Sequence, residues 1–305
     1  MSEITGTRPE SVSPMLVFSG LVRTMRPRQW TKNSIVFAAL IFAHQLGDAA
    51  NVARSVAAFF IFCFLSSTVY LFNDVFDAAN DRAHPTKRRR PVAAGVVSPA
   101  LAVGTGAVFG VASLATALSL SGGLAVIGAT YLVANLLYSA WLKRIVIVDV
   151  MVISAGFVLR AVAGGVAIDV EVSAWLILCT ILLSLFLALC KRRQELALLD
   201  SATAYRGILR EYSIEYLDQM ITIVTAATIV AYSSYTLSAD VQTRLGTHQL
   251  YLTVPFVIYG IFRYLYLVHR KEMGGSPTEA LLADRPLMGG ILLWGAAVVL
   301  ILYLT

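Results

Sequence analysis

The sequence predicts an all-α protein that crosses a membrane many times. Of its 305 residues, 58% are hydrophobic and only 14% are charged, whereas soluble domains average about 25% charged residues. The mean hydropathy is +0.74, and apolar runs long enough to cross a hydrocarbon core of about 30 Å recur along the chain. Basic residues gather between alternate runs, which is typical of a polytopic membrane protein.

Nine apolar runs predict nine membrane-spanning helices. The first run has a short apolar centre, because it contains Asn33, His44 and Gln45. Residues 1–24 are expected to form a cytoplasmic tail and residues 25–305 a single transmembrane bundle, because no linker marks a second domain. The expected spans lie at about 33–49, 55–73, 99–119, 122–140, 145–164, 173–190, 216–237, 250–268 and 287–304.

The basic residues indicate which way the bundle faces. Twenty of them fall in the N-terminal segment and in the loops on its side, whereas only Arg54 and Arg244 fall in the opposite loops. Because cytoplasmic loops carry the excess of Lys and Arg, we expect a cytoplasmic N-terminus. The net charge of +6 suits anionic lipid headgroups and phosphorylated substrates. We expect no nucleic-acid partner, because no basic module exists outside these loops.

A group of oxygen-bearing side chains follows the second expected span. Asn73, Asp77 and Asp81 are spaced four residues apart, and Asp74 precedes the latter two by three and seven residues. On a continuing helix this spacing places several ligands on one face. Like charges this close repel one another unless a cation lies between them. Mg²⁺ suits such a place, because it takes one or two carboxylates and completes its shell with water and phosphate oxygens.

A basic run follows the acidic group within six residues, at Lys87 to Arg90. It supplies positive charge for an anion that arrives with the metal. The alternative is a solvated juxtamembrane loop whose basic residues only set topology. That alternative explains the basic run but not the acidic group, so we favour a metal–phosphate site.

Two charged residues lie inside the fifth expected span. Asp149 is about one turn from its start, and Arg160 lies about three turns deeper. Charges at such depth are costly and mark a polar cavity by default. Each residue either contacts the substrate or forms an internal salt bridge that holds helices together. For Arg160 the two interpretations are equally supported, and for Asp149 we favour substrate contact. Lys32 and Asn33, at the start of the first expected span, are also able to point into the bundle.

These residues resemble the UbiA prenyltransferase superfamily. The pattern Asn73-Asp74-x-x-Asp77-x-x-x-Asp81 is similar to the first Asp-rich motif of that family, and Tyr138 and Lys143 match a Tyr and a Lys at the end of the fourth span. The resemblance runs from Arg26 to the ninth expected span. It implies a nine-helix bundle that binds a diphosphate through Mg²⁺ beside a cavity open to membrane lipids.

One departure from the family pattern is informative. Ordinary members carry a second motif, Asp-x-x-x-Asp, after the sixth span, whereas this chain reads Lys-Arg-Arg-Gln-Glu-Leu at 191–196. Together with Arg-Pro-x-Gln-Trp-x-Lys-Asn at 26–33 and His-Pro-x-Lys at 84–87, this resembles one branch of the family. The resemblance implies transfer of 5-phosphoribose from phosphoribosyl pyrophosphate to a polyprenyl phosphate such as decaprenyl phosphate. In the bacterial inner (plasma) membrane, that reaction leads towards the arabinose donor of the cell wall, with the active site facing the cytoplasm.

The resemblance also implies roles for the candidate residues. The diphosphate and Mg²⁺ are expected beside the carboxylates, and the other phosphates beside Lys and Arg. The expected catalytic residues are Asp74, Asp77 and Asp81, and the expected metal ligands are Asn73, Asp77, Asp81 and Glu195. The expected substrate-binding residues are Lys32, Asn33, Lys87, Arg90, Tyr138, Lys143, Arg144, Asp149, Arg160, Lys191, Arg192, Glu195 and Tyr205.

Two other functions compete with this one. An ordinary prenyltransferase, moving a prenyl group from a prenyl diphosphate to an aromatic or lipid acceptor, retains the first motif but requires the missing acidic pair. A secondary transporter places its binding charges near the bilayer midplane, whereas these cluster near one membrane face. The sequence leaves open whether the protein forms a homo-oligomer.

Overall fold

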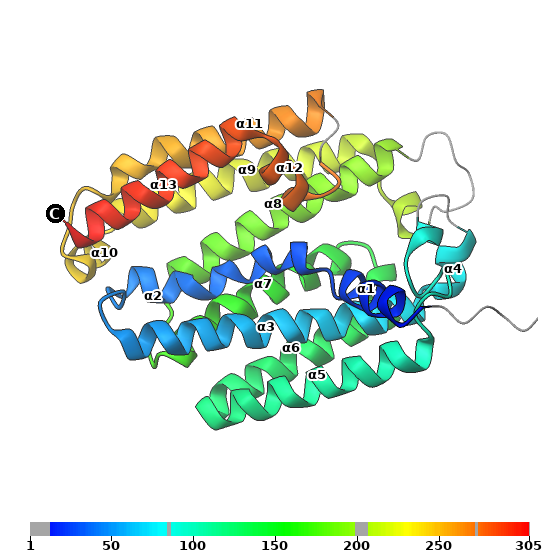
Figure 1. Ribbon diagram of the computed structural model, residues 1–305. Coiled ribbons are helices and arrows are strands. Elements are labelled where there is room, and N and C mark those ends of the chain that lie inside the picture. Colours follow the sequence, from blue (N-terminus) through cyan, green and yellow to red (C-terminus); the bar gives the residue numbers. More distant parts are fainter. Residues whose placement is uncertain (1–12, 84–86, 199–206, 272–273, 305) are drawn as a thin grey trace, which may run out of the picture.

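The computed structural model describes residues 13–83, 87–198, 207–271 and 274–304, and every regular element in these ranges is a helix (Figure 1). The expectation of an all-α protein is confirmed. The elements are α1 (Pro14–Met25), η1 (Pro27–Phe37), α2 (Ala38–Phe42), α3 (Ala49–Phe76), α4 (Ala78–Ala83), η2 (Lys87–Arg89), α5 (Pro99–Leu120), α6 (Gly122–Ala140), η3 (Leu142–Arg144), α7 (Val148–Ala167), α8 (Ala174–Leu198), η4 (Gly207–Glu211), α9 (Ile214–Leu237), α10 (Ala239–Leu245), η5 (Leu250–Thr253), α11 (Val254–Arg270), α12 (Pro277–Ala283) and α13 (Arg285–Tyr303).

Eight helical segments of the described chain are long and apolar enough to cross a membrane. They correspond to the second to ninth expected spans. The first expected span is instead a 3-10 segment, η1, that runs directly into the short helix α2. This segment contacts α3 and α7 and lies along them (Figure 1). The expected count of nine spanning α-helices is therefore not confirmed, although η1 and α2 occupy the place of the first.

The long helices lie side by side, with α4 at one end of the bundle and α10 at the other (Figure 1). We call the end that carries α4 the α4 end. Helix α3 packs against α5, α6, α7 and η1, and its buried side chains meet those of α6 and α7 in one apolar core. Helices α8, α9 and α11 form a second core. Contacts between α7 and α8 join the two halves.

Close packing fixes η1 against α7. A Cβ atom on Gly164 would lie 2.0 Å from the carbonyl oxygen of Val36, so only glycine permits this approach. Val36 itself is fully buried. The contact holds the irregular first segment at a defined depth in the bundle.

The expected tail is partly structured. Helix α1 occupies residues 14–25, where residues 1–24 were expected to form a tail, and residues 1–12 lie outside the described ranges. Gly20 packs against Val96 and Val97, and the hydroxyl of Ser67 donates to the Met25 carbonyl oxygen over 3.1 Å. These contacts form because α1 ends directly beside α3.

Candidate active site

The acidic group lies where α3 ends. The expected continuous helix is wrong here: α3 stops at Phe76, Asp77 caps it, and α4 begins at Ala78. The four-residue spacing nevertheless survives, because the Asp77 amide donates to the Asn73 carbonyl oxygen over 2.9 Å and the Asp81 amide donates to that of Asp77 over 2.8 Å. The break lets the carboxylates point at different cations, which offsets their mutual repulsion.

Two of these carboxylates are buried and share an arginine. Arg90 donates to Asp81 over 2.7 Å and lies 3.4 Å from Asp74. Arg26 donates to Asp74 over 2.6 Å. Asp74 and Asp81 are nearly inaccessible, whereas both arginines are partly exposed at the α4 end. The cations therefore form the accessible rim of a buried acidic pair.

The third carboxylate meets the end of α6. Lys143, in η3, donates to Asp77 over 2.7 Å across 66 residues of sequence. Both side chains are about one-quarter exposed. The structure thus brings an expected substrate-binding lysine to an expected metal-binding carboxylate, and both remain accessible to a ligand.

A second charged network lies at the C-terminal part of α8. Arg192 donates through Nε to Asp149 over 2.7 Å and through Nη2 to the Tyr138 hydroxyl over 3.0 Å. Its Nη1 donates to Glu195, which also lies 3.6 Å from Lys191. Three expected site residues, Asp149, Tyr138 and Glu195, thus contact one guanidinium.

The deepest cation, Arg160, is held by neutral groups. It donates to the side-chain oxygen of Asn33 over 2.6 Å, to the Gly156 carbonyl oxygen over 2.7 Å and to the Tyr131 hydroxyl over 2.7 Å. Its guanidinium also lies over the Tyr131 ring, 4.6 Å from the centroid. No carboxylate is among its partners in the described chain, so the internal salt bridge considered for Arg160 is not formed there.

Further lysines surround these groups. Burial, followed by the positive charges of Arg160 and Arg26, lowers the pKa of Lys32 to about 8. Lys32 in turn lies within electrostatic range of Lys191, and Lys87 within that of Glu195. The lysines of three segments therefore converge near α8.

Three expected residues are less well connected. Arg144 is exposed, and its side chain makes no hydrogen bond or ion pair within the described ranges. Asn73 is half-buried, and its side chain makes no hydrogen bond within the described ranges. Tyr205 lies outside the described residues, so its expected role is untested.

Two residues of the site were missed from the sequence. The sequence identifies Arg26 only as one of the basic residues that indicate topology and as the first residue of the Arg-Pro-x-Gln-Trp pattern, with no role at the site. It has a left-handed backbone, with φ 54°, between α1 and η1. Tyr212, whose hydroxyl donates to Asp149 over 2.8 Å, carries no distinguishing signal in the sequence.

The side chains at the α4 end include oxygen ligands of the type that Mg²⁺ prefers. Within the described ranges, no three His, Cys, Asp or Glu side chains gather as a ready metal site. Mg²⁺ needs fewer protein ligands, since it is usually bound by one or two carboxylates together with substrate phosphates. The accessible Asp77 carboxylate and the unbonded Asn73 amide oxygen provide such hard ligands beside Asp81.

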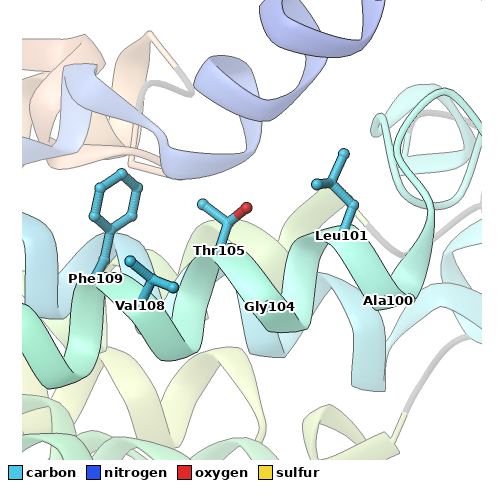
Figure 2. A pocket seen from close by; sticks show the side chains of 6 residues that line it. All are labelled: Ala100, Leu101, Gly104, Thr105, Val108 and Phe109. Carbon is cyan, nitrogen blue, oxygen red and sulfur yellow. The ribbon is translucent and has the colours of Figure 1, made fainter.

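A groove elsewhere is chemically different. It lies on α5, has a volume of about 340 Å³, and is lined by Ala100, Leu101, Gly104, Thr105, Val108 and Phe109 (Figure 2). None of these side chains titrates, and none belongs to the networks above. The groove is thus a feature of the apolar helix surface and not part of the candidate site.

Comparison with known proteins decides the family. Residues 34–280 match the profile of the UbiA prenyltransferase family. The chain belongs to this family. Among its relatives, decaprenyl-phosphate phosphoribosyltransferase of Mycolicibacterium smegmatis is 38% identical over 307 residues, covering 95% of this chain and 96% of the relative. The enzyme of the same name from Corynebacterium glutamicum is 36% identical, covering 95% and 89%. These relatives confirm the expectation of a transferase.

Solved structures confirm the UbiA fold. A UbiA homolog from Archaeoglobus fulgidus bound to GPP and Mg²⁺ superposes with a TM-score of 0.70 at 18% identity, covering 92% of this chain and 99% of that one. The apo structure of a UbiA homolog from Aeropyrum pernix gives 0.65 at 14% identity, covering 90% and 98%. The UbiA assignment and the apolar helices establish a multi-pass membrane protein.

Proposed function

We propose that this UbiA protein transfers 5-phosphoribose from phosphoribosyl pyrophosphate to decaprenyl phosphate or a related polyprenyl phosphate, and releases pyrophosphate. The observation that carries the proposal is the 36–38% identity, over nearly the whole chain, to relatives named for this reaction. We place the reaction at the cytoplasmic face of a bacterial plasma membrane, because the α4 end carries the basic loops.

The charges of the site support a donor with several phosphates. Phosphoribosyl pyrophosphate carries a diphosphate on C1 and a phosphate on C5, and the acceptor brings a third anionic group. Cations outnumber carboxylates around the site, so anions are needed to balance them. The cations are Arg26, Lys32, Lys87, Arg90, Lys143, Arg160, Lys191 and Arg192, and the carboxylates are Asp74, Asp77, Asp81, Asp149 and Glu195.

The acidic group is proposed to hold the donor's diphosphate through Mg²⁺. Asn73, Asp77 and Asp81 would be the ligands, with Glu195 as a further ligand and Asp74 as a ligand or a neighbour of one. When bound, Mg²⁺ would stabilise the negative charge that develops on the departing pyrophosphate. Arg90 lies on Asp81 and Asp74, where its remaining N–H groups are able to bind diphosphate oxygens.

The cations of α8 and η2 are proposed to hold the other donor phosphate. Lys191 is partly exposed, and Lys87 lies within electrostatic range of Glu195. Arg192 is fixed by Asp149 and Tyr138 and presents a rigid guanidinium, which suits phosphate binding. Tyr205, which follows α8 in the sequence and lies outside the described residues, remains a proposed contact of this phosphate.

The acceptor phosphate is proposed to bind between the end of α6 and the acidic group. Lys143 would exchange its Asp77 contact for the phosphate, with Tyr138 and the exposed Arg144 at the sides. The lipid phosphate is already anionic, so its attack on C1 needs no strong general base. Attack opposite the leaving group inverts C1. Arg160 donates a hydrogen bond to Asn33 and adds positive charge near Lys32. Lys32 is proposed to bind a substrate phosphate directly.

A transfer assay tests the proposal. Purified protein, Mg²⁺, polyprenyl phosphate and phosphoribosyl pyrophosphate labelled in the ribose should yield labelled lipid and free pyrophosphate. A donor that lacks the C5 phosphate should react far more slowly, because the cations proposed to hold that phosphate would lose their partner. Equal rates with both donors would contradict the proposed C5-phosphate contacts, and no labelled lipid from either would contradict the function.

A further inference from the structure

A strained turn precedes α7. Ile147 has φ 69° and ψ −45°, and the amide of Val148 donates to the Val146 carbonyl oxygen over 2.8 Å. This is the geometry of a γ-turn with positive φ, which is rare and strained. A β-branched residue is a particular outlier in this region. Such strain persists only where the surrounding structure fixes it, and it gathers at functional sites.

The group that fixes this turn is the hydroxyl of Tyr212. It accepts a hydrogen bond from the Ile147 amide over 2.8 Å and donates one to Asp149 over 2.8 Å. Tyr212 is only 5% exposed and lies between η4 and α9, so it reaches the turn from a different loop. Burial raises the pKa of Tyr212, so its hydroxyl keeps its proton and remains a donor at neutral pH.

The contact continues into the proposed phosphate site. Asp149 is fully buried, and its second oxygen accepts from Nε of Arg192 over 2.7 Å. The other two nitrogens of Arg192 contact Glu195 and Tyr138. One hydroxyl therefore sets the orientation of Asp149, and Asp149 holds the edge of the guanidinium that faces away from Glu195.

We infer that Tyr212 is a positioning residue that orients Arg192, through Asp149, for binding a phosphate of the donor. This rests on the proposed function. Tyr212 need not touch the donor itself. Without the Tyr212 hydroxyl, one oxygen of the buried Asp149 carboxylate would lack a hydrogen-bond donor, which is costly. The carboxylate would therefore rotate towards another donor and away from its present contact with Arg192.

Tyr212→Phe removes only the hydroxyl, and Tyr216→Phe is its matched control. Tyr216 stacks on Tyr212 with ring centroids 6.1 Å apart, and its hydroxyl makes no hydrogen bond within the described ranges. Tyr212→Phe should raise the donor KM roughly tenfold, the scale for one hydrogen bond to a charged group. The acceptor KM should stay within about twofold, and Tyr216→Phe should leave both unchanged. A merely structural role would instead lower the active fraction and leave both KM values unchanged, which would overturn the inference.

Two further measurements separate this inference from the proposed function. Ribose 5-phosphate, which carries only the C5 phosphate of the donor, is titrated by calorimetry, which needs no turnover, and Tyr212→Phe should weaken its binding roughly tenfold. Weakened ribose 5-phosphate binding without any transfer from phosphoribosyl pyrophosphate would contradict the proposed function and keep the inference. Normal transfer with unchanged ribose 5-phosphate binding would contradict the inference and keep the function. Hydrogen exchange of residues 145–150 should accelerate in Tyr212→Phe, which verifies that the bond to Ile147 is lost.

A double-mutant cycle tests whether Tyr212 acts through Asp149. In an Asp149→Asn background, Tyr212→Phe should change the donor KM less than about twofold, because the link is already broken. A full tenfold effect in that background would show that Tyr212 acts by another route and would overturn the inference.

Discussion

At the scale of single residues, Asp77 and Asp81 are the sharpest targets. Each carboxylate contacts a cation that is itself partly exposed, Lys143 and Arg90. Asp77→Asn or Asp81→Asn keeps the side-chain volume and removes one charge of the proposed Mg²⁺ site. We expect activity to fall at least ~10²-fold, the scale for losing a preorganised electrostatic group, while the protein stays inserted and monodisperse.

Asp240→Asn is the matched control for these two variants. Asp240 is exposed on α10, at the opposite end of the bundle (Figure 1). This control should keep full turnover. Near-normal turnover of both Asp77→Asn and Asp81→Asn at saturating Mg²⁺ would contradict the proposal that these carboxylates bind Mg²⁺.

Lys32 should give the activity a pH dependence. Its pKa is lowered to about 8, so the free protein loses this positive charge as the pH rises through about 8. The KM for a phosphorylated substrate should therefore rise between pH 7 and 9. Lys32→Arg should abolish the rise, because arginine stays protonated in this range. The check is KM against pH for both proteins, and the same rise in Lys32→Arg would assign it to another group.

The sequence predicted many residues of the candidate site, but it did not predict which of them contact one another. The acidic spacing, the buried Asp149 and the Lys143 position are visible in sequence, because charges are rare and costly near a membrane. The pairing of Arg26 with Asp74 spans 48 residues, and the Tyr212 contact to Asp149 spans 63. Neither pairing has a local signal, since it depends on how distant helices meet.

At the scale of elements, hydropathy located eight spans but not the form of the first. Apolar length is a property of composition, whereas the 3-10 geometry of η1 accompanies a close backbone approach to α7 that only Gly164 allows. The end of α3 at Phe76 was missed for a similar reason. No glycine or proline marks positions 74–80, so the sequence gives no local signal that the helix ends there.

Gly164 tests how η1 is held. Gly164→Ala would push a methyl group against the Val36 carbonyl oxygen, and η1 would move away from α7. We expect a lower Tm, on the order of the 1–3 kcal/mol that overpacking costs, together with reduced activity as Lys32 and Asn33 shift.

Gly104→Ala is the control for this change. A Cβ atom at Gly104, on α5, meets nothing within 4 Å, and alanine favours helix over glycine. Its Tm should be unchanged or raised. Equal Tm values for the two variants, measured in the same detergent, would show that the η1–α7 approach is loose.

At the scale of the whole molecule, charge asymmetry and site position belong together. The basic loops that predict the cytoplasmic side also supply the cations of the candidate site at the α4 end. A charged donor from the cytoplasm and a lipid acceptor from the membrane would therefore meet at one end of the bundle.

Cysteine labelling tests this orientation. After replacement of Cys63, Cys179 and Cys190 by alanine, Arg88→Cys and Arg244→Cys each introduce one exposed thiol on opposite sides of the membrane. In intact cells, a membrane-impermeant maleimide should label Arg244→Cys only, and permeabilisation should expose Arg88→Cys. Labelling of Arg88→Cys in intact cells would reverse the proposed topology.

Donor choice tests the central claim most directly, because it separates this protein from prenyltransferases of the same family. Purified protein with Mg²⁺ is given polyprenyl phosphate and labelled phosphoribosyl pyrophosphate, and in parallel an aromatic acid and labelled prenyl diphosphate. The replacement of an acidic pair by 191–195 predicts labelled lipid and pyrophosphate from the first mixture only. Transfer from prenyl diphosphate to the aromatic acid, with none from phosphoribosyl pyrophosphate, would contradict the claim.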